Sequence, residues 1–228
     1  GDELPYLTKY LQRVTQSRTR RRFPEAASAL HNEDFINLAK LYQLRVRQLD
    51  STKPFMTDKM PWNFQLVGLI YKAMPWAKVI HIYRNPVDCG FSNFRSPLSK
   101  DIQYSCSFEG FAYYRRIYQD FMNLWHATLP GFFLDLCYEE LVEHPEREIR
   151  RVLDFCGLPW EDKLMAFHST KREIRTISRN QVSKPLNRES IGYEKKYGKL
   201  LDPLKEALRG YGLIDAEGRP RVSGSARP

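Results

Sequence analysis

The chain has 228 residues, of which 42% are hydrophobic, 13% aromatic and 28% charged, and 36 Lys and Arg outnumber 27 Asp and Glu to give a formal net charge of +9. A chain of this size and composition can bury an apolar core, which excludes collagen-like, low-complexity and wholly disordered proteins. The positive charge favours an anionic partner, namely nucleic acid, an anionic lipid surface or a phosphorylated small molecule, and does not choose among them.

Two helices are predicted at the start of the chain, because apolar residues recur at helical spacing from 4 to 14 and again from 35 to 46. Asn32 is the expected cap of the second helix. The arginines at 18 and 20–22 lie between these helices, and we interpret them as a solvated, flexible linker rather than a phosphate site. Two further elements are predicted next: a strand or strand-like loop over 55–59 and a helix over 64–74.

The middle of the chain alternates predicted strands with predicted helices. Residues 78–83 are β-branched and aromatic, which favours a strand, and Pro86 suits the first turn of a helix that reaches about Phe94. Strands separated by helices imply βαβ connections, so the predicted fold class is α/β with a parallel sheet and helices on both faces. The later elements are a long amphipathic helix over 108–129, a strand over 132–138 and a helix over 148–155 that is capped by Gly157.

We predict one domain over residues 1–217 and a disordered tail over 218–228. Beyond Ser169 the pattern weakens into a basic, polar run over 171–199, and a short helix is expected over 200–208. The tail is rich in Gly, Pro and Ser, and chain ends of this composition are commonly disordered.

The cysteines, at 89, 106, 137 and 156, show no C-x-x-C pair and no His cluster. Neither a zinc site nor a dense disulfide framework is therefore expected, and reduced thiols in a cytoplasmic protein fit best. The sequence holds no run of roughly 20 apolar residues that would suit a membrane helix. Its first 22 residues are too polar for a secretory signal.

Residues that directly follow the strands are the first candidates for a binding site, because ligands bind outside the carboxyl ends of the strands in an open parallel sheet. Arg84 follows the strand over 78–83, and Ser92 lies about two helical turns further on. A guanidinium fork and a hydroxyl suit a phosphate. The alternative is a surface Arg84 paired with Asp88, and an exposed helical serine.

Residues 78–92, with the run Arg84-Asn85-Pro86-Val87-Asp88, resemble the sulfotransferase family that uses 3′-phosphoadenosine 5′-phosphosulfate (PAPS). Other stretches resemble the same family in the same order, in particular its bacterial branch and the tyrosylprotein sulfotransferases. They are TDKMP at 57–61, YEELV at 138–142, DFCGLPW at 154–160 and QVSKP at 181–185. The resemblance implies a P-loop-like parallel sheet flanked by helices.

The resemblance also implies a set of nucleotide-binding residues. Arg84 and Ser92 match the pair that grips the 3′-phosphate, and Tyr138 matches the tyrosine that packs against the adenine. Lys184 resembles a lid residue near the cofactor. Without the resemblance, Tyr138 is equally well explained as an aromatic at the edge of the core, and Lys184 as a solvated lysine.

Two further residues are the expected catalytic pair. Lys59 matches the cation that stabilises charge on the oxygen bridging phosphate and sulfur, and its alternative is a salt-bridged loop lysine beside Asp58. Glu3 lies in a Gly-Asp-Glu-Leu-Pro segment similar to the one that carries the catalytic carboxylate of tyrosylprotein sulfotransferases. Its alternative is a carboxylate that favours a helix start. His81, within a strand, is expected to be a packed or exposed strand histidine rather than a rival base.

The sequence departs from the family at two places. It holds no G-x-x-x-x-G-K-[ST] run or other Gly-rich loop that would cradle the 5′-phosphosulfate, so the first strand and phosphate loop are expected to be missing and the chain N-terminally truncated. Near residues 190–194, relatives often carry a basic residue followed by Trp, for which only Lys195 and Lys196 could substitute.

We therefore expect a sulfotransferase that moves a sulfuryl group from PAPS to a hydroxyl acceptor by in-line displacement, without a metal and without a membrane. Peptide tyrosine, a carbohydrate and a small molecule all stay open as acceptors. The alternative is a non-catalytic basic module that binds nucleotide or nucleic acid, although the basic residues are dispersed and no nucleic-acid motif is present. A nucleotide kinase of related topology lacks any positive motif.

Overall fold

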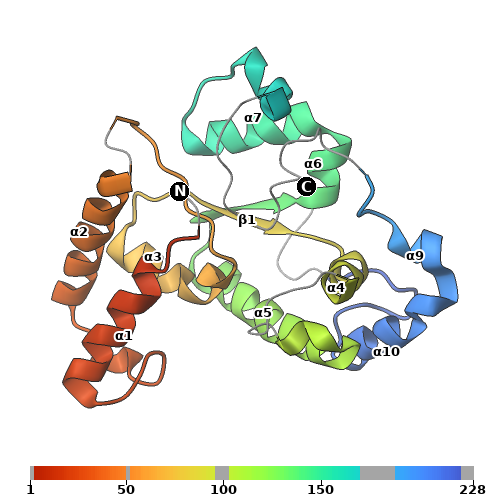
Figure 1. The fold of residues 1–228 in the computed structure, drawn as a ribbon, viewed down its shortest axis with the longest axis horizontal. Helices are drawn as coiled ribbons and strands as arrows, with labels where there is room; N and C mark the ends of the chain where they lie inside the picture. The colour runs from red at the N-terminus through yellow and green to blue at the C-terminus, as the bar shows by residue number, and fades with distance from the viewer. Residues whose placement is uncertain (1–2, 50–51, 96–102, 170–187, 222–228) are drawn as a thin grey trace. The chain divides into compact units, whose positions relative to one another are not determined.

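The structure, a computed structural model, describes residues 3–49, 52–95, 103–169 and 188–221 (Figure 1). The chain divides into two compact units, residues 1–77 and 78–228, which are described one at a time. The expected tail begins at Gly218, and its first residues are tied back, since the Arg221 N–H donates to the Leu213 carbonyl (3.0 Å). The rest of it, 222–228, lies outside the described residues.

Residues 1–77 form a small helical unit. Its elements are α1 (Tyr6–Thr19), α2 (Asn32–Leu49) and α3 (Val67–Ala73), with 3-10 turns at Ala27–Ala29 and Pro61–Leu66. The predicted helices are confirmed, and their apolar faces supply the buried Leu7, Leu11 and Leu38. Residues 55–59 form a loop without strand pairing, in agreement with the second of the two predicted options.

The interpretation of Arg18 as part of a solvated linker was wrong. Arg18 lies in the last turn of α1, and its guanidinium pairs with the buried carboxylate of Asp34 through both oxygens. Arg18 Nη1 also donates to the Ala29 carbonyl (3.1 Å). The start of α2 is held in the same way: Asp34 accepts the His31 N–H (2.7 Å), whereas Asn32, the predicted cap, is the first helical residue.

Residues 78–228 contain a two-stranded parallel sheet, which confirms the α/β fold class. Strand β1 (Val79–Tyr83) pairs with β2 (Phe133–Cys137) so that His81 lies opposite Asp135 and Tyr83 opposite Cys137. Helices α4 (Pro86–Arg95) and α5 (Phe108–Thr128), with a 3-10 turn at Gln103–Cys106, connect the two strands. Figure 1 shows α5 on one side of the sheet and α7 on the other.

The elements after β2 are mostly short helices. Tyr138 is the first residue of α6 rather than the last of a strand. Gly157 ends α7 in the left-handed conformation (φ 69°), as the sequence predicted for its cap. The elements in order are α6 (Tyr138–Glu143), α7 (Pro145–Cys156), a 3-10 segment (Asp162–Ser169), α9 (Tyr193–Tyr197), a 3-10 turn (Gly198–Leu201) and α10 (Asp202–Gly210).

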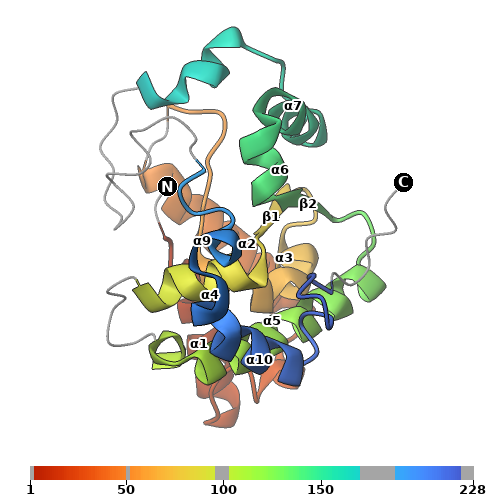
Figure 2. The ribbon, with the colours of Figure 1, turned by 90° about the vertical axis from the view of Figure 1, so that its right-hand side faces the viewer.

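The core of this unit lies where α4, α5 and α10 meet, and Figure 2 shows these helices close together. Val87, Phe111 and Leu204 are buried in it. The helices approach closely at Gly90, where a Cβ atom would lie 2.8 Å from Phe111 Cε1 and 3.0 Å from Leu204 Cδ1. Glycine is therefore required at this position, because both neighbours are themselves buried and have little room to move.

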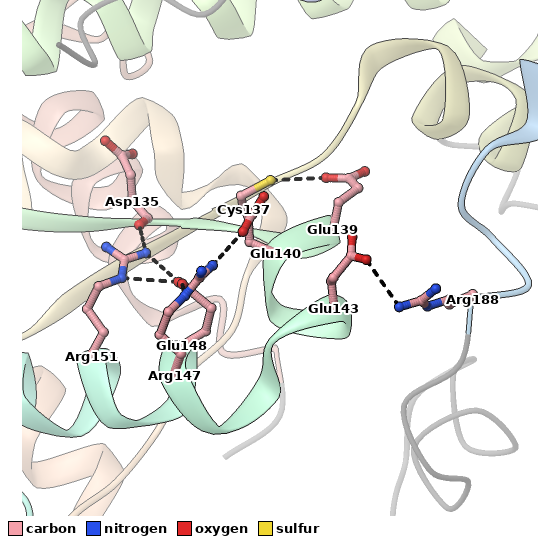
Figure 3. Close-up of polar contacts among 9 residues, drawn as sticks. All are labelled: Asp135, Cys137, Glu139, Glu140, Glu143, Arg147, Glu148, Arg151 and Arg188. Atoms are coloured by element: carbon pink, nitrogen blue, oxygen red, sulfur yellow. Dashed lines mark hydrogen bonds and ion pairs between the residues drawn. The ribbon is translucent and has the colours of Figure 1, made fainter. Parts of the chain in front are cut away.

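A buried carboxylate joins α7 to the sheet (Figure 3). Glu148 accepts hydrogen bonds from Arg147 Nε (2.9 Å) and Arg151 Nη2 (2.8 Å), and Arg151 Nη2 also donates to the Asp135 carbonyl of β2 (2.7 Å). Burial by itself would raise the pKa of Glu148, but the hydrogen bonds from the two arginines outweigh it and hold the pKa below its ordinary value.

Replacing Glu148 by glutamine should lower the free energy of unfolding by about 1–3 kcal/mol at neutral pH, because two guanidinium groups lose a charged acceptor. A lowered carboxyl pKa gives stabilisation that is present above the ordinary pKa and is lost as the pH falls through the lowered one. The difference between variant and wild type should therefore shrink in acid. Urea titrations at several pH values measure the free energy of unfolding of both proteins.

Glu146→Gln is the control, because Glu146 is an exposed partner of Arg150, and it should change stability by under about 0.5 kcal/mol. Equal losses in the two variants would contradict the stabilising role of the buried Glu148.

Candidate functional site

Arg84 and Tyr138 meet at the carboxyl end of the sheet. Arg84 directly follows β1 and Tyr138 directly follows β2, and the register that pairs Tyr83 with Cys137 makes the two residues neighbours. The guanidinium carbon of Arg84 lies 4.7 Å from the centre of the Tyr138 ring, a cation–π contact. The sheet thus brings together two of the residues that the sequence predicted to bind a nucleotide.

The guanidinium of Arg84 is fixed by one hydrogen bond, but not all of its donors have partners among the described residues. Its Nη2 donates to the Ser190 carbonyl (2.7 Å), whereas its Nε is buried and has no hydrogen-bond partner among the described residues. Asp88 does not pair with Arg84, contrary to the alternative that the sequence left open; it accepts the backbone N–H groups of Gly192 and Tyr193. A buried donor without a partner is costly, so an anionic oxygen would be a favourable partner for this Nε.

The turn that carries Arg84 is fixed by its neighbours. Asn85 Oδ1 accepts from the N–H groups of Val87 (2.9 Å) and Asp88 (3.2 Å) and so caps α4, whose first residue is proline. The Asn85 N–H donates to Glu139 Oε1 (2.9 Å) at the start of α6. The strand-to-helix turn after β1 is therefore tied to the corresponding turn after β2.

Glu139 also accepts from Cys137 Sγ (3.2 Å), the last residue of β2 (Figure 3). Burial is the main cause that raises the pKa of the Cys137 thiol, and Glu139 raises it further. This cysteine is therefore held as a neutral thiol beside the site. All four cysteines lie among the described residues, and each is free.

Ser92 and Lys184 have no established part in this arrangement. Ser92 is half-buried in α4, eight residues after Arg84, and keeps its predicted role as an expectation. Lys184 lies outside the described residues.

Glu3 and Lys59, the expected catalytic pair, form an ion pair with each other within residues 1–77. Asp58 places them: its Oδ1 accepts the Leu4 N–H (3.2 Å) and its Oδ2 accepts the Tyr42 hydroxyl (2.8 Å), which holds the chain start against the loop that carries Lys59. Lys59 is thus a salt-bridged loop lysine beside Asp58, as its alternative interpretation proposed, and its partner is Glu3. The side chains of Glu3 and Lys59 are 44% and 66% exposed, so the pair is weak and open to exchange.

A polar cluster lies on the face of the sheet that α5 covers, and the sequence did not indicate it as a cluster. His81 Nδ1 lies 2.6 Å from Asp135 Oδ1, and its Nε2 bonds the hydroxyl of Tyr118 on α5. His126 Nε2 lies 3.3 Å from the second oxygen of Asp135. Burial raises the pKa of Tyr118 to about 12, so its hydroxyl stays protonated. His81 is thus a packed strand histidine, one of the two expected outcomes.

Within the described part of the chain, no group of three or more His, Cys, Asp or Glu is arranged to hold a metal ion. The helices in that part include none with the length and apolar character required to cross a membrane.

Comparison with known proteins identifies relatives of the chain. The family described as "Sulfotransferase family" matches residues 4–162. An uncharacterized protein of Aquifex aeolicus is 34% identical over 215 residues, which cover 91% of this chain and 28% of that protein. Protein-tyrosine sulfotransferase A of Caenorhabditis elegans is 24% identical over 155 residues, or 60% of this chain and 38% of its own. Protein-tyrosine sulfotransferase 1 of Danio rerio is 25% identical over 154 residues, which cover 60% of this chain and 41% of that protein. The chain thus spans well under half the length of these relatives.

Proposed function

The chain belongs to the sulfotransferase family, and from this premise we propose that it binds PAPS and transfers its sulfuryl group to a hydroxyl acceptor. The observation that carries the proposal is the Arg84 guanidinium, which is stacked on Tyr138 and keeps a buried Nε donor without a partner among the described residues. A phosphate would satisfy that donor, and an aromatic ring beside it suits adenine.

The residues at the sheet would bind and orient the nucleotide. Arg84 would take the 3′-phosphate together with Ser92, and Tyr138 would stack on the adenine. Lys184 would close on the nucleotide as a lid residue. A nucleotide bound in this way would supply the sulfuryl group and leave as adenosine 3′,5′-bisphosphate.

Glu3 and Lys59 would handle the charges of the transfer. The Glu3 carboxylate accepts the proton of the acceptor hydroxyl as that oxygen attacks sulfur, and the Lys59 ammonium stabilises the negative charge on the departing bridging oxygen. The bond from sulfur to the acceptor oxygen forms as the bond to the bridging oxygen breaks, on opposite sides of sulfur. The exposed ion pair supports this assignment, because a weak pair gives up its mutual contact readily.

The acceptor is proposed only by class. Peptide tyrosine is favoured because matched relatives are named protein-tyrosine sulfotransferases. Carbohydrate and small-molecule hydroxyl groups are the other candidates, since acceptor loops vary on a shared scaffold. The free cysteines support a cytoplasmic location.

Calorimetric binding of adenosine 3′,5′-bisphosphate to the 228-residue chain tests the proposal, with adenosine 5′-monophosphate as the comparison ligand. Charge-assisted hydrogen bonds to the 3′-phosphate should favour the bisphosphate by at least about tenfold. Equal affinities for the two nucleotides in a folded protein would contradict the proposal. Tight, steeply salt-dependent binding of an oligonucleotide without this preference would favour a nucleic-acid-binding module instead.

A further inference from the structure

We propose that Asp88 is a positioning residue for the candidate nucleotide site, and that it acts through residues 188–193, here called the strap. Asp88 fixes the strap, and the strap holds the Ser190 carbonyl against Arg84. The inference rests on the proposed function for the identity of the ligand, but the contacts of Asp88 and the strap form without any ligand.

Asp88 is built into the interior beside the site. It lies in the first turn of α4, and only 4% of the residue is exposed. Both carboxylate oxygens are used: Oδ2 accepts the Gly192 N–H and Oδ1 accepts the Tyr193 N–H, each at 2.8 Å. Since these donors are backbone groups more than 100 residues away along the chain, the carboxylate joins α4 to the strap and to the start of α9.

The strap is held by buried contacts at its far end and by an exposed ion pair at its near end. At its far end Tyr193 is buried, with its ring 5.1 Å from that of Phe91 on α4, and Figure 2 shows α9 beside α4. Gly192 adopts a positive φ of 76°, which turns two successive N–H groups toward Asp88 at little strain. At its near end Arg188 pairs with Glu143 of α6 at 3.3 Å (Figure 3). Ser190 lies between these two contacts.

The strap in turn fixes the plane of the guanidinium. Arg84 Nη2 donates to the Ser190 carbonyl at 2.7 Å while the guanidinium lies on Tyr138. With one edge bound and one face stacked, the guanidinium cannot rotate freely, and its buried Nε stays ready for an anion. Preorganisation of this kind raises affinity because less side-chain entropy is lost on binding. Asp88 itself does not bond the Arg84 side chain.

The test compares Asp88→Asn with wild type and with Asp120→Asn, a matched control at an exposed carboxylate that pairs with Arg116 on α5. The first readout is made without ligand and follows the NMR signal of Arg84 Nε–H. This signal is assigned by its disappearance in the Arg84→Lys variant. Its hydrogen exchange should be slow in wild type and control and at least about tenfold faster in Asp88→Asn, since the amide offers a donor where one backbone N–H needs an acceptor.

The second readout is nucleotide selectivity. In Asp88→Asn, the preference for adenosine 3′,5′-bisphosphate over adenosine 5′-monophosphate should fall by about tenfold, while affinity for the monophosphate stays near wild type. A merely structural role would weaken both ligands alike. Arg188→Ala releases the other end of the strap by removing a solvent-exposed ion pair. It should speed hydrogen exchange of Arg84 Nε–H by a few fold without lowering the melting temperature. This variant replaces Asp88→Asn if Asp88→Asn fails to fold.

The two proposals fail in different ways. Slow Arg84 Nε–H exchange in a folded Asp88→Asn and in Arg188→Ala overturns the positioning role of Asp88, whatever the ligand. A wild-type chain that shows no preference for the bisphosphate overturns the proposed function, and the ligand-free exchange rates still decide whether Asp88 and the strap hold Arg84.

Discussion

Replacing Arg84 by alanine is expected to weaken binding of adenosine 3′,5′-bisphosphate by roughly 30- to 1,000-fold, which corresponds to about 2–4 kcal/mol. The variant removes the donors proposed for the 3′-phosphate. It also leaves the Ser190 carbonyl without its guanidinium donor and removes the cation from the Tyr138 ring. Isothermal titration calorimetry measures the loss, and adenosine 5′-monophosphate should be affected far less.

Two controls make this result specific. Arg116→Ala removes an equal charge from the solvent-exposed surface of α5 and should change affinity by less than about threefold. Arg84→Lys keeps the charge but not the planar fork, so it should recover only part of the loss. An Arg84→Ala protein that is folded and binds both nucleotides as wild type does would refute the assignment of Arg84 to the phosphate.

Leu204→Ala should lower the free energy of unfolding by about 2–5 kcal/mol. Leu204 is fully buried, with 0% exposure, where α10 packs against α4 and α5. Removing its branched end leaves a cavity beside Gly90 and Phe111 that the rigid helices cannot fill. Urea denaturation followed by circular dichroism gives the difference.

Leu200→Ala is the matched control for this cavity. Leu200 lies four residues earlier and is 75% exposed, so the same chemical change should alter stability by less than about 0.5 kcal/mol. Similar losses in the two variants would mean that the packing of α10 on α4 and α5 does not stabilise this unit.

The helices and strands of the chain could largely be predicted because their signals are local. The β-branched run before Arg84 predicted β1 to within one residue, and Gly157 marked the end of α7. The start of α6 at Tyr138 was missed, because an apolar strand runs into it without a break and only six residues form the helix. A helix of that length is too short for a periodic pattern to emerge.

The contacts that build the site could not be predicted, because they join residues far apart in the sequence. Glu3 and Lys59 were predicted separately, but not as partners of each other. The bond from Arg84 to Ser190 spans 106 residues. Arg18 was misjudged for the same reason, since its partner, the buried Asp34, belongs to the next helix. The residue type shows that an arginine is charged, but only the fold determines which carboxylate it pairs with.

The polar cluster on the sheet also favours the observed register of β1 and β2 over shifted ones. A slip of two residues between β1 and β2 would keep every side chain on its own face, yet it would set His81 opposite Phe133 or Cys137. Asp135 would keep its contact with His126 but would lose its shorter contact with His81. Losing a hydrogen-bond partner costs a partly buried carboxylate stability, so the slipped pairings are disfavoured even where their backbone hydrogen bonds are complete. The same histidine and aspartate, which take no part in the candidate nucleotide site, thereby favour the alignment in which Arg84 ends beside Tyr138.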